Sequence, residues 1–246
     1  MTFEELVAEA EADPEIVGVM LGGSQGRGGI VTEHSDLDVY FVAVDDEARK
    51  SWARKHPLRH GDPIEVITIT LGFLRERPKP RTPEAYDAYA LAHVAVLVDK
   101  LNGEVAALVE ARELVDPASA SEPLDDFVNY VYRARKSARA GNRRAARLDA
   151  AESVGPFLEF LFAVHGRVRP FNKWLEWELE HHPLERSWKV DELLPRLERL
   201  LDGDEVELVA SFRDAERLAR ERGLGETIDG WEPDVAWLRG DHSVEG

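Results

Sequence analysis

The 246-residue chain contains no cysteine. Disulfide bonds and thiolate-bound metals are therefore excluded, and any metal must be held by oxygen or imidazole ligands. The eight histidines include the pair His181-His182, but none of them shows a metal-ligand spacing such as H-E-x-x-H. We expect the histidines at the surface or behind other site residues.

Long apolar runs are also missing. The longest, residues 92–98 and 157–164, are well short of the roughly 20 residues that a membrane-spanning helix needs. The opening residues, MTFEELVAEAEADPE, are acidic and amphipathic, whereas a secretory signal begins with a basic patch and an unbroken apolar core. We therefore expect no membrane segment, no export and a cytoplasmic location.

Positive charge is scarce: 31 Lys and Arg face 48 Asp and Glu, for a formal net charge of -17. A general nucleic-acid binder needs a surplus of cations to neutralise phosphates, so we expect no nucleic-acid partner. An acidic surface favours the approach of a cationic small molecule. Solubility, or adaptation to a salty cytoplasm, explains the same charge equally well.

Hydrophobic periodicity in the first half predicts one short helix and then strands. Apolar residues in segment 3–12 recur at the spacing of one helix face, and Asp13-Pro14 ends that helix. A further helix is expected over 45–56, and a loop followed by a short helix over 72–90. Runs rich in β-branched residues predict strands at 16–21, 37–44, 64–70 and 93–98.

The pattern changes at the small and polar residues 116–121, which we interpret as a linker. Beyond them strand patterns disappear, and shared apolar faces, as in 157–164, predict helices. Residues 153–156 (SVGP) and His182-Pro183 are expected breaks between helices. The predicted fold class is α+β, with a small mixed β-sheet domain over 1–118 followed by an all-α helical bundle over 122–246.

Glycines are concentrated in residues 21–29 (LGGSQGRGG), directly after the first predicted strand. A Walker-type phosphate loop requires Gly-Lys followed by Ser or Thr, but no lysine precedes Lys50. A dinucleotide fingerprint beginning at Gly26 would place Val31 where helix packing requires Gly or Ala. Neither motif therefore accounts for the glycines.

Two acids, Asp36 and Asp38, stand at the start of the second predicted strand. Because strand side chains alternate, both project from the same face, roughly 6.6 Å apart along the strand. Two uncompensated anions repel, so this arrangement favours a divalent cation, and carboxylate oxygens suit Mg²⁺. The alternative interpretation is a turn at the strand entrance in which the aspartates cap the backbone.

A third acid, Glu65, lies among Ile and Val residues of the third predicted strand. An ionised Glu in such surroundings is costly to bury unless it is paired, metal-bound or protonated. Joining the two aspartates from an adjacent strand would satisfy it. The alternative is a solvent-facing position on an edge strand.

Gly-Ser after one strand, Asp-x-Asp on the next and a single acid on a third resemble the active-site signature of the nucleotidyltransferase superfamily, which has the DNA polymerase beta fold. The matching segments are residues 23–28 (GSQGRG), 35–38 (SDLD) and 64–66 (IEV). The chain looks most like the antibiotic nucleotidyltransferase branch, which modifies aminoglycosides or lincosamides and carries a helical C-terminal domain. The second half matches only loosely, through its helical pattern and residues 170–175 (PFNKWL).

The resemblance implies a role for each motif residue. Gly23, Ser24 and the backbone around them would hold triphosphate oxygens. Asp36 and Asp38 would bind Mg²⁺, with two ions expected, and Glu65 would complete the site as a ligand or as the base that deprotonates the acceptor hydroxyl.

Two cations remain as candidates with an alternative each. Arg27 either contacts phosphate or is an exposed loop cation. Lys173 either approaches the phosphates from the helical domain, as the resemblance implies, or is a surface lysine.

Two other charged segments stand out in the second half. Residues 133–147 hold seven Lys and Arg and no acid. Two interpretations are open for this expected helix: one edge of it faces the triphosphate, or its basic face pairs with acidic neighbours. Glu176, Glu178 and Glu180 with Trp174 and Trp177 either line a pocket for a cationic sugar or belong to the core.

The resemblance implies a Mg²⁺-dependent nucleotidyltransferase. It would move a nucleoside monophosphate, AMP from ATP or another nucleotide, to a hydroxyl of a small, aminoglycoside-like acceptor and release pyrophosphate. Two alternatives stay open: an enzyme of toxin–antitoxin type that places AMP on a partner protein, and a catalytically silent nucleotide-binding module. The sequence indicates no oligomeric state.

Overall fold

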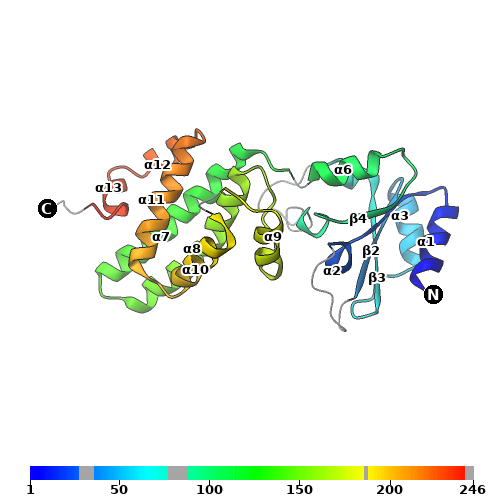
Figure 1. Cartoon of the computed structure of the whole chain (residues 1–246), viewed down its shortest axis with the longest axis horizontal. Coiled ribbons are helices and arrows are strands. Elements are labelled where there is room, and N and C mark those ends of the chain that lie inside the picture. Colours follow the sequence, from blue (N-terminus) through cyan, green and yellow to red (C-terminus); the bar gives the residue numbers. More distant parts are fainter. Residues whose placement is uncertain (28–35, 77–87, 113, 186–187, 242–246) are drawn as a thin grey trace. The chain divides into compact units, whose positions relative to one another are not determined.

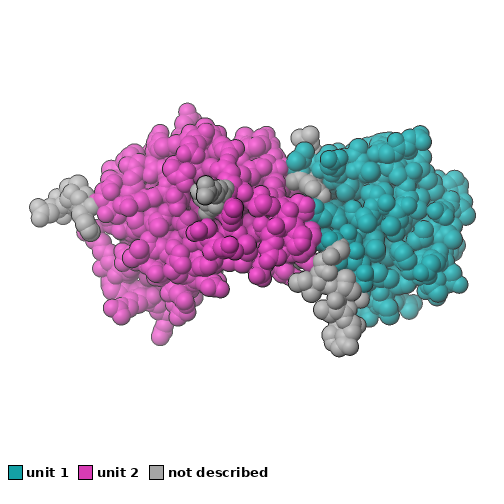
Figure 2. All heavy atoms as spheres, in the orientation of Figure 1, with its two compact units in different colours: residues 1–114 teal, residues 115–246 magenta. Residues whose placement is uncertain are grey.

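A computed structural model describes residues 1–27, 36–76, 88–112, 114–185 and 188–241 of the chain. Contacts divide it into two compact units, residues 1–114 and 115–246 (Figure 2). The boundary precedes the expected linker, whose residues form the 3-10 helix η1 (Pro117–Ala120) and the start of the next helix. Each unit is described by itself below.

The first unit is built on a mixed four-stranded sheet (Figure 1). Its strands are β1 (Ile16–Leu21), β2 (Leu37–Ala43), β3 (Ile64–Thr70) and β4 (Ala95–Asp99), in the order β3-β2-β1-β4. β1 pairs antiparallel with β2 and β4, whereas β2 and β3 are parallel. The four strands lie close to the segments predicted from β-branched runs.

Helices cover both faces of this sheet because its strands are apolar on both sides. α1 (Phe3–Ala12) and α3 (Asp46–Lys55) bury Leu6 and Trp52 against Val39 and Phe41 of β2. On the opposite face, α4 (Leu71–Arg75) and α6 (Glu104–Arg112) pack with residues of β2 two apart, Tyr40 and Val42 among them. Even-numbered residues of β2 therefore point toward α4 and α6.

The ends of these helices are held by side chains that the sequence supplies locally. Thr2 and Glu5 form a capping box at the start of α1, and Asp45 accepts the backbone N–H of Ala48 at the start of α3, 2.9 Å away. The ammonium of Lys100 donates to the carbonyls of Ala10 and Asp13, at 2.7 Å each, where α1 ends. Such contacts satisfy terminal backbone groups that have no partner within the helix.

The second unit is helical. A large apolar core includes Phe127, Phe157, Phe160 and Phe212, all fully buried, and the rings of Phe127 and Phe157 stack with centroids 4.7 Å apart. Its helices are α7 (Ser121–Arg139), α8 (Arg143–Val164), η2 (Asn172–Trp174), α9 (Leu175–His181), α10 (Val190–Leu201), α11 (Glu205–Glu221), α12 (Gly225–Asp229) and α13 (Val235–Leu238).

The helix break expected at residues 153–156 is wrong. α8 runs without interruption from Arg143 to Val164, with Pro156 inside it. Proline costs a helix one hydrogen bond and several kcal/mol in isolation, but Pro156, Phe157 and Leu158 are buried. Burial of this face outweighs the local preference, whereas the expected break at His182-Pro183 is confirmed, since α9 ends at His181.

The basic segment 133–147 is not one helix either. α7 ends at Arg139, Gly141 adopts a φ of +75°, and Asn142 caps α8 by accepting the N–H of Ala145 at 3.2 Å. A positive φ and a side-chain cap are the usual signs of a turn between helices. The seven cations are therefore divided between two antiparallel neighbours.

The helices that the structure describes include none with the length and apolar character needed to span a membrane.

Candidate metal centre

Three carboxylates converge at one end of the sheet. Asp36, Asp38 and Glu65 each offer an oxygen within 4.8 Å of the others, and this is the one group of three or more potential ligands among the described residues. The sequence predicted this convergence from strand alternation and from the cost of burying Glu65. In the structure Asp36 and Asp38 lie together, and Glu65 joins them from the adjacent strand.

The strand register explains the convergence. Asp38 on β2 stands directly opposite Glu65 on the parallel strand β3. Asp38 shares the face of Tyr40 and Val42, and Glu65 that of Ile67 and Ile69, which pack in the same cluster beside α4 and α6. Asp36, two residues before Asp38, joins them because strand side chains repeat with period two.

Glu65 lies on an edge strand, yet its side chain is only 14% exposed. The backbone N–H of Gly61 donates to its Oε1 at 3.0 Å, and His60 Nδ1 lies 3.4 Å from its Oε2. The Glu65 side chain is therefore not solvent-facing, although its strand lies at the edge of the sheet. The turn that precedes β3 holds this carboxylate toward the aspartates.

The glycines after β1 pack onto Asp38. The backbone N–H of Gly22 donates to the carbonyl of Asp38 at 2.8 Å. Gly23 has a φ of +59°, and a β-carbon there would stand 2.2 Å from Asp38 Oδ2. The glycines therefore allow the backbone to approach the acid, which is a more specific role than a flexible turn.

The turn itself forms a short helix. α2 (Gly23–Gly26) is a single turn in which Ser24 is buried. The N–H of Gly26 donates to the carbonyl of Gly22 at 2.8 Å. The motif positions Gly28 and Ser35, and the glycine at 29, lie outside the described residues.

Arg27 follows α2 and is half-buried. Its guanidinium donates to the carbonyl of Gly23 at 3.1 Å and to that of Tyr89 at 2.7 Å, and it lies 4.9 Å from the centre of the Tyr89 ring. Arg27 is therefore not an exposed loop cation. The contact of Arg27 with Tyr89 could not be predicted from the sequence, because a contact across 62 residues leaves no local pattern.

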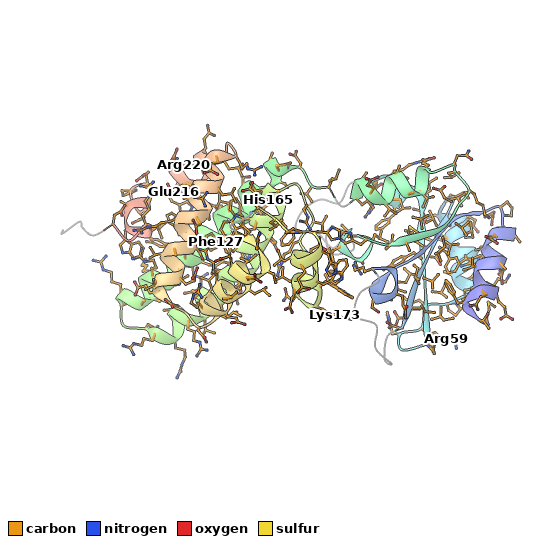
Figure 3. The ribbon with its side chains drawn as sticks, in the orientation of Figure 1. Arg59, Phe127, His165, Lys173, Glu216 and Arg220 are labelled. Carbon is orange, nitrogen blue, oxygen red and sulfur yellow. The ribbon has the colours of Figure 1, made fainter. Side chains whose placement is uncertain are left out.

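Lys173 belongs to the second unit, in η2 (Figure 3). It is exposed, and its ammonium lies 5.2 Å from the centre of the Trp174 ring. The structure thus brings Asp36, Asp38, Glu65 and Gly23 together within the first unit. A role of Lys173 at the phosphates stays a prediction.

One acid of the segment 174–180 has a structural partner. Glu178 is buried and pairs with Arg167, whose guanidinium also donates to the carbonyl of His182. Trp174 is buried as well, while Trp177 stacks on His181 with ring centroids 4.7 Å apart. Glu178 therefore ties α9 to the preceding loop and does not line an open pocket.

The basic segment divides between paired and exposed cations. Arg133 pairs with Asp149 at 2.9 Å and Arg147 with Asp202 at 3.0 Å. The guanidinium of Arg135 is buried against the Trp237 ring and donates to its carbonyl. Burial lowers the pKa of Arg135 from its ordinary value. Pairing with acids thus accounts for part of this segment.

The acidic group has the composition and spacing of a site for a divalent metal ion. Oxygens within 4.8 Å of one another are close to the spread of about 4.2 Å between opposite ligands of a Mg²⁺ ion. The donor set is purely carboxylate, which matches the preference of this hard cation. Three carboxylates at such distances repel strongly unless a cation or protons neutralise them.

Comparisons with known proteins found a likeness in structure alone. Neither the protein-family models nor the curated proteins gave a match to the sequence. Among solved structures, the chain is similar to a nucleotidyltransferase-like protein from Exiguobacterium sibiricum 255-15, with 12% identity over 97% of this chain and 86% of that one and a TM-score of 0.41. This likeness concerns the fold alone.

Proposed function

We propose that this protein is a nucleotidyltransferase that transfers a nucleoside monophosphate from a nucleoside triphosphate to a hydroxyl group. The convergence of Asp36, Asp38 and Glu65 beside a glycine turn carries the proposal. Three carboxylates gathered on adjacent strands suit the binding of metal ions that accompany a triphosphate. A purely structural role would not require acids to be packed together at this cost.

In the proposed reaction, the acceptor oxygen forms a bond to the α-phosphorus while the bond from that phosphorus to the bridging oxygen breaks. Pyrophosphate leaves with the electron pair of the broken bond. Asp36 and Asp38 hold the metal ions, two being expected, which when bound supply positive charge to the triphosphate and the attacking oxygen. The backbone around Gly23 and Ser24 contacts the triphosphate, as the resemblance implies.

Glu65 has two candidate tasks. It is either a third ligand or the group that accepts the hydroxyl proton of the acceptor. The contacts from Gly61 and His60 fix its carboxylate beside the aspartates in both cases. Glu65→Gln distinguishes them, because loss of a ligand weakens metal affinity, whereas loss of a base lowers the rate and leaves metal affinity unchanged.

For the substrates we propose ATP as nucleotide donor and a small, aminoglycoside-like hydroxyl compound as acceptor. The net charge of -17 supports a cationic acceptor, because an acidic surface raises the local concentration of cations. A helical unit in the same chain also favours a small molecule over a partner protein. No nucleic-acid acceptor is proposed.

The test combines purified full-length protein with Mg²⁺ and α-labelled ATP or GTP. Acceptors are a panel of aminoglycosides and lincosamides, and separately a proteome lysate. Label in a small molecule together with pyrophosphate supports the proposal, and label in protein supports the AMP-on-protein alternative. Absence of pyrophosphate with every acceptor, and of any difference between wild type and Asp38→Ala, rejects both enzymatic functions.

Asp38→Ala should lower turnover by at least about 100-fold, a loss typical of removing a group that stabilises transition-state charge. Asp46→Asn is the matched control, since Asp46 is an exposed acid of the same unit whose partner is Arg49. Equal losses in both variants would point to general destabilisation and contradict a site at Asp38.

A further inference from the structure

Directly after α2 lies an arginine whose guanidinium donates to two backbone carbonyls. Arg27 joins the carbonyl of Gly23 to that of Tyr89, a residue that is 62 positions away and fully buried. Its guanidinium also lies against the Tyr89 ring. The two hydrogen bonds use guanidinium N–H groups of Arg27. An arginine that binds phosphate directs such groups to the nucleotide.

α2 needs such a support. A single helical turn is unstable by itself, because nucleation fixes several dihedral angles for few hydrogen bonds. α2 has four residues, two of them glycines, and no side-chain cap at its N-terminus. Arg27 supplies a donor to the carbonyl of Gly23, and terminal carbonyls of this kind have no partner within a helix.

The position of α2 decides the position of Asp38. Gly23 contacts the Asp38 carboxylate so closely that no β-carbon fits between them, and the Gly22 N–H is bonded to the Asp38 carbonyl. A movement of Gly23 would therefore open space directly beside the Asp38 carboxylate. Contacts then run from Tyr89 through Arg27 and Gly23 to Asp38.

We propose that Arg27 is a positioning residue, which braces α2 against Tyr89 and thereby fixes the Asp38 carboxylate for metal binding, and that it is not a ligand of the triphosphate. This inference rests on the proposed function. It differs from the two roles considered for Arg27 in the sequence, contact with phosphate and an exposed loop cation. The orientation of the metal ligand would then depend on a residue that touches neither metal nor nucleotide.

The experiment measures two properties that need no catalytic turnover. The first is Mn²⁺ affinity of the nucleotide-free protein, by electron paramagnetic resonance. The second is amide hydrogen exchange of the peptide that covers residues 22–27. Arg27→Ala should weaken Mn²⁺ binding about 10-fold, as is typical of residues that orient a metal ligand, and should remove exchange protection in that peptide.

Three further variants sharpen the comparison. Gly23→Ala disturbs the same carboxylate from the other side, so its Mn²⁺ affinity should fall as well, and the double variant should lose less than the two effects combined. Arg27→Lys should restore most of the affinity, because one ammonium can hold two carbonyls, as Lys100 does in this protein. Arg75→Ala, which removes an exposed arginine of the same unit, is the control.

The KM for ATP at saturating metal separates positioning from phosphate binding. Positioning predicts a KM within about twofold of wild type, whereas a phosphate ligand predicts a KM raised at least about 10-fold. Unchanged Mn²⁺ affinity and exchange with a raised KM would overturn the inference. If wild type binds no Mn²⁺, the metal-dependent function fails, and exchange still decides whether Arg27 braces α2. If Arg27→Ala does not fold, Arg27→Gln, too short to span both carbonyls, replaces it.

Discussion

Asp38 occupies the space that any side chain at position 23 would need. An ideal β-carbon on Gly23 would stand 2.2 Å from Asp38 Oδ2, and the φ of +59° there is itself unfavourable for other residues. The glycine and the acid are therefore parts of one arrangement, although fifteen positions separate them in the sequence.

Gly26→Ala should destabilise the first unit. A β-carbon at Gly26 would lie 2.0 Å from the backbone oxygen of Leu21, which cannot move without distorting β1. Overpacking of this kind costs about 1–3 kcal/mol, measurable as a lower urea midpoint. Gly72→Ala in α4 is the control, because its nearest neighbour is a side-chain oxygen at 3.6 Å, and equal midpoints for the two variants would contradict the steric argument.

Asp36→Asn should stabilise the metal-free protein. It removes one of three mutually repelling charges, each pair of which costs about 1–3 kcal/mol at an effective dielectric constant of 20 to 80. In EDTA the melting temperature should therefore rise above that of wild type. In saturating Mg²⁺ the order should reverse, since ligand binding to the native state stabilises wild type more; the same order in both conditions would argue against a metal site.

Lys173→Ala tests the expected phosphate contact from the second unit. If Lys173 approaches the triphosphate, the KM for ATP should rise about 10-fold, the value of one hydrogen bond to a charged group. Mn²⁺ affinity of the nucleotide-free protein should not change. Lys189→Ala, at the start of α10, serves as the control, and an unchanged KM in Lys173→Ala would identify Lys173 as a surface lysine.

Glu216 should make the second unit sensitive to acid. It lies on α11 (Figure 3), where hydrogen bonds from Arg239, and then from Arg220, hold its pKa below the ordinary value of 4.5. A depressed folded-state pKa adds stability above the unfolded pKa, and this stability is lost as the pH falls through the folded value. The free energy of unfolding should therefore decrease below about pH 4.5.

Glu216→Gln measures this contribution. It should cost about 1–3 kcal/mol at pH 7, less than a fully buried pair because the arginines are partly exposed. It should also flatten the acid limb of the stability profile. Glu221→Gln removes an exposed partner of Arg217 and should cost less than about 0.5 kcal/mol; an unchanged acid limb in Glu216→Gln would contradict the assignment.

Arg144→Glu should stabilise α8. Arg143 and Arg144 are exposed in the first turn of this helix, which contains no acid. Cations at a helix N-terminus oppose the helix dipole, and an acid there contributes about 0.3–1 kcal/mol. The gain should appear in urea unfolding at low salt and shrink at 1 M salt, whereas a loss of stability would show that Arg144 makes a contact of its own.

The sheet and the acidic cluster could be predicted because both follow from local patterns. Strand segments are apolar on both faces, and the spacing of Asp36 and Asp38 determines that they share one of them. Glu65 required one further step, the cost of an acid among Ile and Val. The parallel register that places Glu65 opposite Asp38 depends on how two distant segments pair.

One error arose where tertiary contacts override local preference, and another where a local turn divides a segment rich in helix formers. Residues 153–156 resemble a break, but burial of Pro156 and Phe157 keeps α8 continuous. The segment 133–147 is rich in helix-forming residues, and a single Gly141-Asn142 step divides it. The support of α2 by Tyr89 and the contact of His60 with Glu65 are long-range or depend on a turn, and periodicity reports neither.

The segment around α13 has a practical consequence for recombinant work. Arg239 supplies two donors to the buried Glu216, and Trp237 packs against the buried guanidinium of Arg135. A version of the protein that ends at α12 would lack Arg239, a partner of Glu216, and Trp237, against which the Arg135 guanidinium is buried. The C-terminal boundary for expression of the helical unit therefore belongs after Asp241, even though the segment beyond α12 is short.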